Sequence, residues 1–413
     1  MCKKCLESLK SKNLLVVAFV LDRESGSESK IASDLLRIYA ENAQNVKVLT
    51  SSLTPDTELT KFRDEFFGKI EFNVHDFPKF FLRHGRAVFL IGIKLWHRKA
   101  LKNKSEQILY AGLDLGIHLS YATFFYGTPL SKLQIPYIFG PAGFSKFSRN
   151  SIRVNGMWSL LEILRNFLVD SILRFDPFVR KSFAKASIII PTDTTIKQNL
   201  QDILNISNLT DPIPHISVTI SEGNESKKLL RLIWVGHFIK KKDPFLALEI
   251  FEKVANNFDN LTLQFCGTGP LENKLRNAIA ASPYKSRIFV SGWLTSKKVH
   301  HEISKSEILI HTSSRETAGN QILESIMLGT KVITSCRSNL FTWLSTPAIS
   351  YVEIEALISR KELVSRYACE ILDWFSIEPL IRLKLIDSSQ DLLKDFNPNR
   401  IVENTLHEYF SLN

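Results

Sequence analysis

The sequence predicts an α/β protein built from two doubly wound domains of similar size. Short apolar runs of strand length alternate with helical patterns along most of the chain, which is typical of parallel sheets covered by helices. The alternation pauses once, in a polar stretch near the middle, and then resumes with regular spacing. The length of 413 residues allows each series its own buried core.

The first series of elements starts with the apolar run 13–21, a predicted buried strand, and continues with an amphipathic helix over 29–43. Further predicted strands lie at 46–52, at the end of 108–122, at 135–143 and at 186–192. In a parallel sheet all these strands end at the same edge, where open α/β sheets bind ligands.

The second series follows the polar segment 205–228, which contains two prolines and a glycine and no long helical pattern. Its predicted strands are 230–238, 261–270, 287–293, 307–314 and 331–335, its predicted helices are 244–258, 271–281, 296–306 and 321–328, and a mostly helical tail covers 358–411. We therefore expect a first domain over 1–205, a linker over 206–228, a second domain over 229–390, and a C-terminal helix within 391–413 that packs back on the first domain.

Composition favours a globular protein that works in the cytoplasm. Charged residues make up 23% of the chain and apolar ones 44%, as in ordinary soluble domains, and no apolar run approaches the ~18–20 residues that span a bilayer. Five cysteines without a regular spacing indicate a reducing compartment. Cys2 and Cys5 form a CxxC pair without a second ligand pair nearby, so we expect a disordered tail there, with a metal or redox site as the alternative.

The net charge of +11 is concentrated in the first half, where residues 1–220 hold 29 Lys and Arg against 20 Asp and Glu. Segment 77–104 contributes most, with eight basic residues, no acidic residue and many large apolar ones. Three interpretations are open. The segment could lie on an anionic membrane surface, pack as a helix with a solvated basic face, or bind nucleic acid, although no nucleic-acid-binding motif accompanies it.

Candidate binding residues in the second domain come directly after predicted strands. Gly236 ends the first of these strands, and the lysine run 240–242 that follows could neutralise phosphate oxygens. Asp243 and Pro244 suit the N-cap and first position of the next helix. Taken alone, this piece favours a solvated basic turn.

Candidate binding residues also stand at the ends of the next two predicted strands. Gly267 and Gly269 allow a tight turn or a close approach of backbone to a ligand. Trp293, followed by Leu294, could meet a nucleobase at the third strand end, or it could pack in the core.

Two glutamates flank the start of the predicted helix 321–328. Amides from Gly319 onward, near Asn320, and the helix dipole favour an anion such as a diphosphate. Glu324 could accept hydrogen bonds from a ribose diol, and Glu316 could hold a second set of hydroxyls. Ordinary use of acidic residues at a helix start is the alternative.

In the first domain, the loop 23–29 follows the first strand and carries Gly26 and Ser27, which could give a tight turn and a helix cap against a phosphate or sugar. His118 lies near the end of a predicted strand, where a histidine can donate to a sugar oxygen or transfer a proton. A structural role for this single histidine is the alternative. Segment 139–144 again places Gly and Pro after a strand.

Taken in order, these motifs resemble glycosyltransferase family 4, whose members are retaining nucleotide-sugar transferases with the GT-B fold of two Rossmann-like domains facing across a cleft. The stretch "SSRETAGNQILESIMLGTKVITS" resembles that family's E-x7-E region, and "WVGHFIKKKDP" resembles its donor-phosphate segment. "CGTGP" and "VSGW" match the next two loops, while "GSE", "IHLSY" and "IPYIFGPAG" resemble a bacterial branch of the family.

The resemblance implies catalytic roles for three residues. Glu316 should contact hydroxyls of the donor sugar, His118 should lie near the sugar being transferred, and Lys242 should neutralise the diphosphate leaving group. The implied donor-binding residues are Gly26, Ser27, Gly236, His237, Lys242, Gly267, Gly269, Trp293, Leu294, Glu316, Gly319, Asn320 and Glu324. No metal or other cofactor is implied, because lysine charge and the helix dipole take its place.

Three positions depart from the family pattern. His237 stands where the family usually has Arg, which removes a bidentate phosphate contact. Phe144 replaces a glycine, and Ile117 replaces one histidine of a common pair.

The function implied is hexosyl transfer to a glycan or lipid-linked acceptor in surface polysaccharide biosynthesis, in the cytoplasm or on the inner face of the plasma membrane, without nucleic acid as a partner. The alternatives are a catalytically weak binding subunit of a glycan assembly complex, suggested by His237, and another GT-B activity such as sugar-nucleotide epimerisation.

Overall fold

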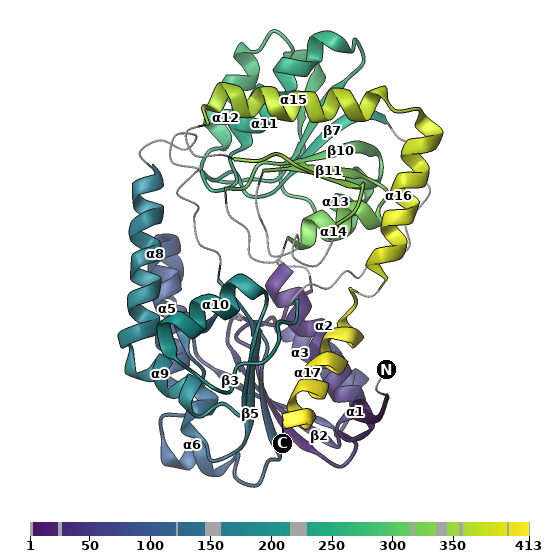
Figure 1. Cartoon of the computed structure of the whole chain (residues 1–413). Coiled ribbons are helices and arrows are strands. Elements are labelled where there is room, and N and C mark those ends of the chain that lie inside the picture. Colours follow the sequence, from purple (N-terminus) through teal and green to yellow (C-terminus); the bar gives the residue numbers. More distant parts are fainter. Residues whose placement is uncertain are drawn as a thin grey trace. The chain divides into compact units, whose positions relative to one another are not determined.

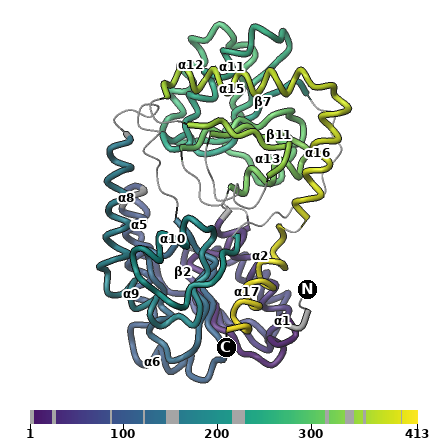
Figure 2. Tube along the Cα trace, viewed as in Figure 1, coloured from purple at the N-terminus to yellow at the C-terminus, as the bar shows by residue number. Residues whose placement is uncertain are grey.

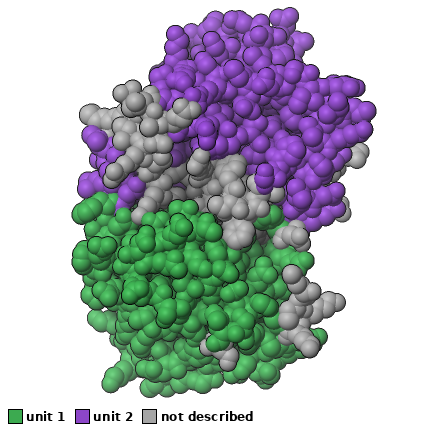
Figure 3. All heavy atoms as spheres, in the orientation of Figure 1, with its two compact units in different colours: residues 1–144, 167–217, 396–413 green, residues 145–166, 218–395 purple. Residues whose placement is uncertain are grey.

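The computed structural model of the chain describes residues 3–23, 27–120, 123–144, 158–214, 229–314, 319–335, 345–354, 358–394 and 396–412. Within them lie two six-stranded sheets whose paired strands run parallel (Figure 1). The chain divides into two compact units, which Figure 3 colours separately: residues 1–144, 167–217 and 396–413 form unit 1, and residues 145–166 and 218–395 form unit 2. The predicted α/β class with two doubly wound sheets is confirmed.

The sheet of unit 1 has the order β3-β2-β1-β4-β5-β6. Its strands are β1 (Asn13–Val17), β2 (Asn45–Ser51), β3 (Ile70–His75), β4 (Leu115–His118), β5 (Tyr137–Ala142) and β6 (Ile188–Pro191). The helices are α1 (Lys3–Glu7), α2 (Ser27–Asn42), α3 (Asp56–Glu65), α4 (Phe80–Arg83), α5 (Gly85–Lys99), α6 (Lys104–Ile108), α9 (Pro177–Ala184), α10 (Thr194–Leu204) and α17 (Pro398–Leu412), with α8 (Trp158–Phe175) shared between the two units.

Strand β1 lies at the centre of this sheet and is buried on both faces. Leu14 and Val16 contribute to one apolar cluster, together with residues of α2. Leu15 and Val17 contribute to a second cluster, as expected from the alternation of side chains along a strand. A continuous apolar run is therefore the pattern that this position requires.

The C-terminal helix α17 belongs to the core of unit 1. Ile401, Val402 and Leu406 are buried in the same cluster as Leu14, and α17 packs against α1 and α2. Figure 2 shows this last segment of the chain, in yellow, among the purple elements of the first residues.

The sheet of unit 2 has the order β12-β11-β10-β7-β8-β9. Its strands are β7 (Leu229–Val235), β8 (Thr262–Cys266), β9 (Ile288–Val290), β10 (Ser306–His311), β11 (Lys331–Thr334) and β12 (Ile349–Tyr351). Its helices are α11 (Pro244–Val254), α12 (Glu272–Ala281), α13 (Ser296–Ser304), α14 (Asn320–Met327), α15 (Arg360–Ser376) and α16 (Pro379–Leu393). The chain moves from β7 to β8 on one side and returns to place β10 on the other. The carboxyl ends of β7 and β10 therefore flank the topological switch point, where doubly wound sheets bind ligands.

The structure contains elements that sequence analysis does not predict, among them helices α3, α8, α9 and α10. Strands β3 and β12 are not predicted, because β3 is a half-exposed edge strand and β12 has only three residues. The N-terminal segment, expected to be disordered, contains helix α1, and Cys5 is buried in the core of unit 1. Among the described residues, no helix combines the length and apolarity needed to cross a membrane.

Part of the predicted linker 206–228 pairs with strand β6. The amide of Ile189 donates to the carbonyl of Asn208 at 2.9 Å, and the amide of Thr210 donates back to the carbonyl of Ile189 at 3.0 Å. Residues 215–228 lie outside the described residues. The chain thus stays attached to the sheet of unit 1 for several residues after α10.

Candidate functional site

The loops that follow β7, β8 and β9 are joined by main-chain hydrogen bonds. The amide of Gly236 donates to the carbonyl of Cys266 at 3.0 Å, and the amide of Phe238 donates to that of Thr268 at 2.8 Å. One strand further, the amide of Gly267 donates to the carbonyl of Gly292 at 2.8 Å. Three loops that sequence analysis treats separately therefore form one surface at the carboxyl edge of the sheet.

Gly267 and Gly269 are required by this contact between loops. A Cβ atom on Gly267 would lie 1.8 Å from the carbonyl oxygen of Gly236, and one on Gly269 would lie 2.8 Å from the backbone of Phe238. Both glycines also have φ values, 149° and 156°, that other residues rarely adopt. The tight-turn interpretation accounts for both residues, because they allow the two loops to lie in backbone contact.

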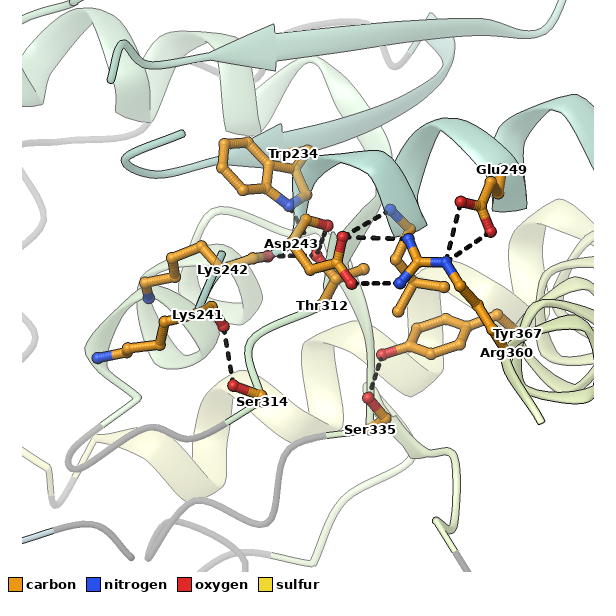
Figure 4. A network of polar contacts seen from close by, with 11 residues as sticks. Trp234, Lys241, Lys242, Asp243, Glu249, Thr312, Ser314, Ser335, Arg360 and Tyr367 are labelled. Atoms are coloured by element: carbon orange, nitrogen blue, oxygen red, sulfur yellow. Dashed lines mark hydrogen bonds and ion pairs between the residues drawn. The ribbon is translucent and has the colours of Figure 1, made fainter. Parts of the chain in front are cut away.

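The lysine loop between β7 and α11 is fixed through its carbonyls (Figure 4). The hydroxyl of Thr312, just after β10, donates to the carbonyls of Lys242 at 2.7 Å and Asp243 at 2.9 Å. The amide of Ser314 donates to the carbonyl of Lys241 at 2.9 Å. These hydrogen bonds fix the backbone of the loop. The side chains of Lys241 and Lys242 point away from them, as Figure 4 shows.

Asp243 forms the next part of the same network. Its side chain accepts from the amide of Leu246 at 3.1 Å and Pro244 follows at the first helical position, so the predicted N-cap of α11 is confirmed. Asp243 itself has φ 44° and ψ 68°, a left-handed conformation that is unfavourable for most residues.

Arg360, at the start of α15, holds this residue in place. Its guanidinium donates to both carboxylate oxygens of Asp243, at 2.6 and 3.1 Å, and through Nε to the carboxylate of Glu249 at 2.9 Å (Figure 4). Burial works against the charged guanidinium, but the two carboxylates outweigh it and raise the pKa of Arg360. The strained turn and the lysine loop are therefore bound to α15.

His237 and Trp293 meet across two of the joined loops. Their rings stack with centroids 5.9 Å apart and planes 29° apart. Both side chains are exposed, Trp293 to 59%, so the indole is a surface residue and the core interpretation is excluded. Leu294 follows it and is half-buried. An exposed stacked pair of this kind offers an aromatic face to a planar group.

The start of α14 lies beside the end of β7. Gly319 is the N-cap, with φ 70°, and the side chain of Gln321 donates to the carbonyl of Val235 at 2.9 Å. Asn320 is buried, with 6% of its surface exposed, and its Oδ1 has no hydrogen-bond partner among the described residues. The amides that begin this helix are thus brought to the switch point together with the lysine loop.

Glu324 is the fifth residue of α14, one turn beyond its start. The first turn, 320–323, contains no acidic residue, so capping or dipole stabilisation of the helix start does not explain Glu324. Its side chain is 18% exposed, and Oε2 lies 3.7 Å from Nε2 of His300 on α13.

The remaining predicted site residues belong to unit 1 or lie outside the described residues. His118 ends β4, is buried, and its Nδ1 lies 3.1 Å from the hydroxyl of Thr128. Ser27 is the first residue of α2. Gly26 and Glu316 fall outside the described residues.

Sequence analysis missed the residues that support the lysine loop. Thr312 and Ser314 stand in the quoted E-x7-E region or directly before it, and a hydroxyl directly after a strand was the available signal. Arg360 has no such signal, because its partners lie 117 and 111 residues away.

Part of unit 2 is similar to a known protein family. Residues 219–340 match the family described as glycosyl transferases group 1. The matched segment lies within unit 2. The match covers β7 to β11, including the joined loops, the lysine loop and the start of α14. A search of curated proteins finds no match for the sequence.

Solved structures extend the likeness over both units. A glycosyltransferase from Rickettsia africae is 13% identical, with a TM-score of 0.61 over 97% of this chain and 98% of that one. Anabaena HepE, crystallised with UDP and glucose, is 11% identical, with a TM-score of 0.60 over 97% and 100%. The N-terminal domain of Candida albicans trehalose-6-phosphate phosphatase is 11% identical, with a TM-score of 0.68 over 98% and 97%. At these identities the likeness shows the fold, which is the GT-B fold of glycosyltransferases.

Proposed function

We propose that this protein is a retaining glycosyltransferase that moves a hexose-type sugar from a nucleoside-diphosphate-sugar donor to a glycan or lipid-linked acceptor. The observation that carries the proposal is the convergence of two features at one switch point. These are the joined loops after β7, β8 and β9, which carry the lysine run and the exposed Trp293, and the start of α14. All of them lie within or beside the segment that matches glycosyl transferases group 1.

Each part of the site has a role in this reaction. Lys242 and the first amides of α14 stabilise the negative charge that develops on the diphosphate as the anomeric C–O bond breaks, without a need for a metal. Glu324 accepts the ribose hydroxyls, and Trp293 with Leu294 meets the base. Glu316 holds hydroxyls of the donor sugar.

The configuration of the anomeric carbon is retained if the acceptor oxygen attacks this carbon from the face that the diphosphate leaves. The new C–O bond then forms on that face, and a leaving diphosphate oxygen takes the acceptor's proton. His118, at the end of β4 in unit 1, is the candidate for a contact with the transferred sugar, and the loop of Gly26 and Ser27 is the candidate for a contact with the donor. HepE of Anabaena, with UDP and glucose in its crystals, supports a uridine nucleotide as the first donor to test.

The exposed His237 favours a second candidate, a binding subunit of a glycan assembly complex with weak catalysis. A histidine lacks the bidentate guanidinium that grips a diphosphate, and here its ring is stacked on Trp293. Such a protein would bind the nucleotide without transferring the sugar.

A lipid-linked acceptor would bring unit 1 to an anionic membrane on the inner face of the plasma membrane. Exposed apolar side chains lie on α4, α5 and α8 of this unit, among them Phe80, Ile91 and Phe167. Helix α5 is linked to the start of α9, because Lys94 of α5 pairs with Asp176, the N-cap of α9, at 2.7 Å. Basic and apolar groups on one set of helices suit an anionic lipid surface.

A thermal-shift screen with UDP-, GDP-, ADP- and dTDP-sugars tests the proposal. One nucleotide sugar should raise the melting temperature, and product analysis with that donor should show transfer that Glu316→Ala abolishes without unfolding the protein. Binding without transfer would select the subunit interpretation, and an altered sugar nucleotide would select an epimerase. The proposal fails if none of the four sugars binds.

A further inference from the structure

The paired histidines of α13 have no role in the arrangement described so far. His300 is buried, with 6% of its surface exposed, whereas His301 is exposed. Neither ring nitrogen of His300 has a hydrogen-bond partner among the described residues. A buried polar group without a partner destabilises a fold, so its presence requires an explanation.

The ring of His300 faces Glu324. Its Nε2 lies 3.7 Å from Oε2 of the carboxylate, and α13 packs against α14. This distance is longer than a hydrogen bond by about 1 Å, so a small turn of either side chain would let Nε2–H donate to the carboxylate. The contact is therefore nearly formed in the unligated protein.

The position of α13 connects this pair to the rest of the site. The helix begins two residues after Leu294, in the loop that carries the exposed Trp293. The side chain of Glu324 is 18% exposed, so solvent reaches part of it although it also lies next to His300.

We propose that His300 is a positioning residue for ribose recognition by Glu324. When the vicinal hydroxyls of a ribonucleoside diphosphate donate to Glu324, its carboxylate turns and accepts a hydrogen bond from Nε2–H of the imidazole. The carboxylate is then held from both sides, and the imidazole gains the partner that it lacks without ligand. This inference rests on the proposed function, because it takes Glu324 as the ribose ligand.

A purely structural role for His300 makes the opposite prediction for stability. If the ring only fills space and supports the packing of α13 on α14, replacing it lowers the melting temperature of the unligated protein. If it is kept for ligand binding, His300→Leu removes an unpartnered polar group from the interior and leaves that melting temperature unchanged or higher.

The experiment compares wild type with His300→Leu, His300→Gln and the matched control His301→Leu, using calorimetric titration with UDP and with 2′-deoxy-UDP. We expect His300→Leu to bind UDP about tenfold more weakly, as for loss of a hydrogen bond to a charged group, and to bind 2′-deoxy-UDP as wild type does. His300→Gln, which keeps an N–H donor, should recover part of the affinity, and His301→Leu should not differ from wild type. If the donor screen selects another base, its ribose and 2′-deoxyribose diphosphates take the place of this pair.

Three results would overturn the inference while leaving the proposed function intact: equal UDP binding by wild type and His300→Leu, an equal loss for both nucleotides, or a lowered melting temperature of the unligated variant. A wild type that binds no nucleotide in the donor screen would remove the proposed function, and the inference with it.

Discussion

Arg360 holds Asp243 through two hydrogen bonds to its two carboxylate oxygens, although 117 residues separate them in the sequence. Asp243 is also the N-cap of α11 and the left-handed residue that ends the lysine loop. One ion pair thus connects α15 to the loop that we assign to diphosphate binding.

Replacing Arg360 should weaken both the fold and the site. Arg360→Ala leaves Asp243 in its strained conformation without the charged partner, and we expect unfolding to become easier by about 2–3 kcal/mol. Chemical denaturation measures this loss, and the stabilisation by UDP should fall with it. Arg360→Lys should recover only part, because an ammonium cannot bind two carboxylates with the same geometry.

Arg366→Ala is the matched control, since Arg366 lies on the same helix and pairs with Glu362 in an exposed i,i+4 contact. Its effect should stay below about 0.5 kcal/mol. Equal losses in the two alanine variants would show that the Asp243 contact has no special role.

Lys242→Ala should reduce the binding of a nucleoside diphosphate by about tenfold or more, because a charge-assisted contact to phosphate is lost. Titration with UDP measures the change. Lys240→Ala is the comparison, since that side chain is exposed and belongs to the same loop. A loss of the same size in both variants would point to general attraction by the basic loop and would remove Lys242 from the site.

Gly267→Ala should destabilise unit 2 severely, by more than about 3 kcal/mol or to the point of failed expression. The added Cβ would meet the carbonyl oxygen of Gly236 at 1.8 Å. Gly292→Ala is the comparison, because Gly292 has φ 71° but an added Cβ there would meet no atom within 4 Å. It should lose only about 1 kcal/mol, from backbone strain alone. Melting temperatures that shift equally would contradict the close contact between the loops.

His97 should make unit 1 sensitive to acid. Burial lowers the pKa of this ring to about 4, while in the unfolded chain it titrates near 6.5. Between these values the unfolded state binds more protons, so stability is lost as the pH falls from about 6.5 to 4, by about 3 kcal/mol in all.

His97→Phe removes this dependence and suits the site, because the ring is stacked between Phe19 and Tyr126 at 5.9 Å from each. The test is the free energy of unfolding measured from pH 7 to pH 4. The variant should lose less stability over this range than wild type, while His407→Phe, at an exposed position, should follow wild type. Parallel pH curves for His97→Phe and wild type would contradict the assignment.

Charge reversal on α4 tests the proposed membrane surface. Lys79→Glu with Arg83→Glu changes two exposed residues and should weaken binding to vesicles of anionic phospholipid at least about tenfold. The double change Lys274→Glu and Lys361→Glu in unit 2 alters the net charge equally and should leave flotation unchanged. Flotation that is the same for all three proteins would exclude this surface.

The elements that sequence analysis predicts well are those whose cause is local. Asp243 and Pro244 indicate the start of α11, because the side chain of Asp243 accepts a hydrogen bond from the amide of Leu246, three residues later. The buried run at β1 is likewise a local pattern, whereas the glycines after β8 are needed for contacts with Gly236 and Phe238 on the neighbouring loop. The contact of Arg360 with Asp243 has no counterpart in local pattern, because it depends on where α15 packs. The half-exposed β3 is missed for a related reason, since an edge strand lacks the continuous apolar run of a central one.

The inclusion of α17 in the core of unit 1 has a consequence for biosynthesis. Ile401 and Leu406 fill the same cluster as residues of β1 and α2, yet the ribosome makes them after the whole of unit 2. The elements of unit 2 from β7 to α15 precede α17 in the chain and leave the ribosome before it, whereas unit 1 keeps an uncovered apolar face until α17 emerges. The part of the chain that is made first is therefore expected to be completed last, and chaperones have that interval in which to act on it.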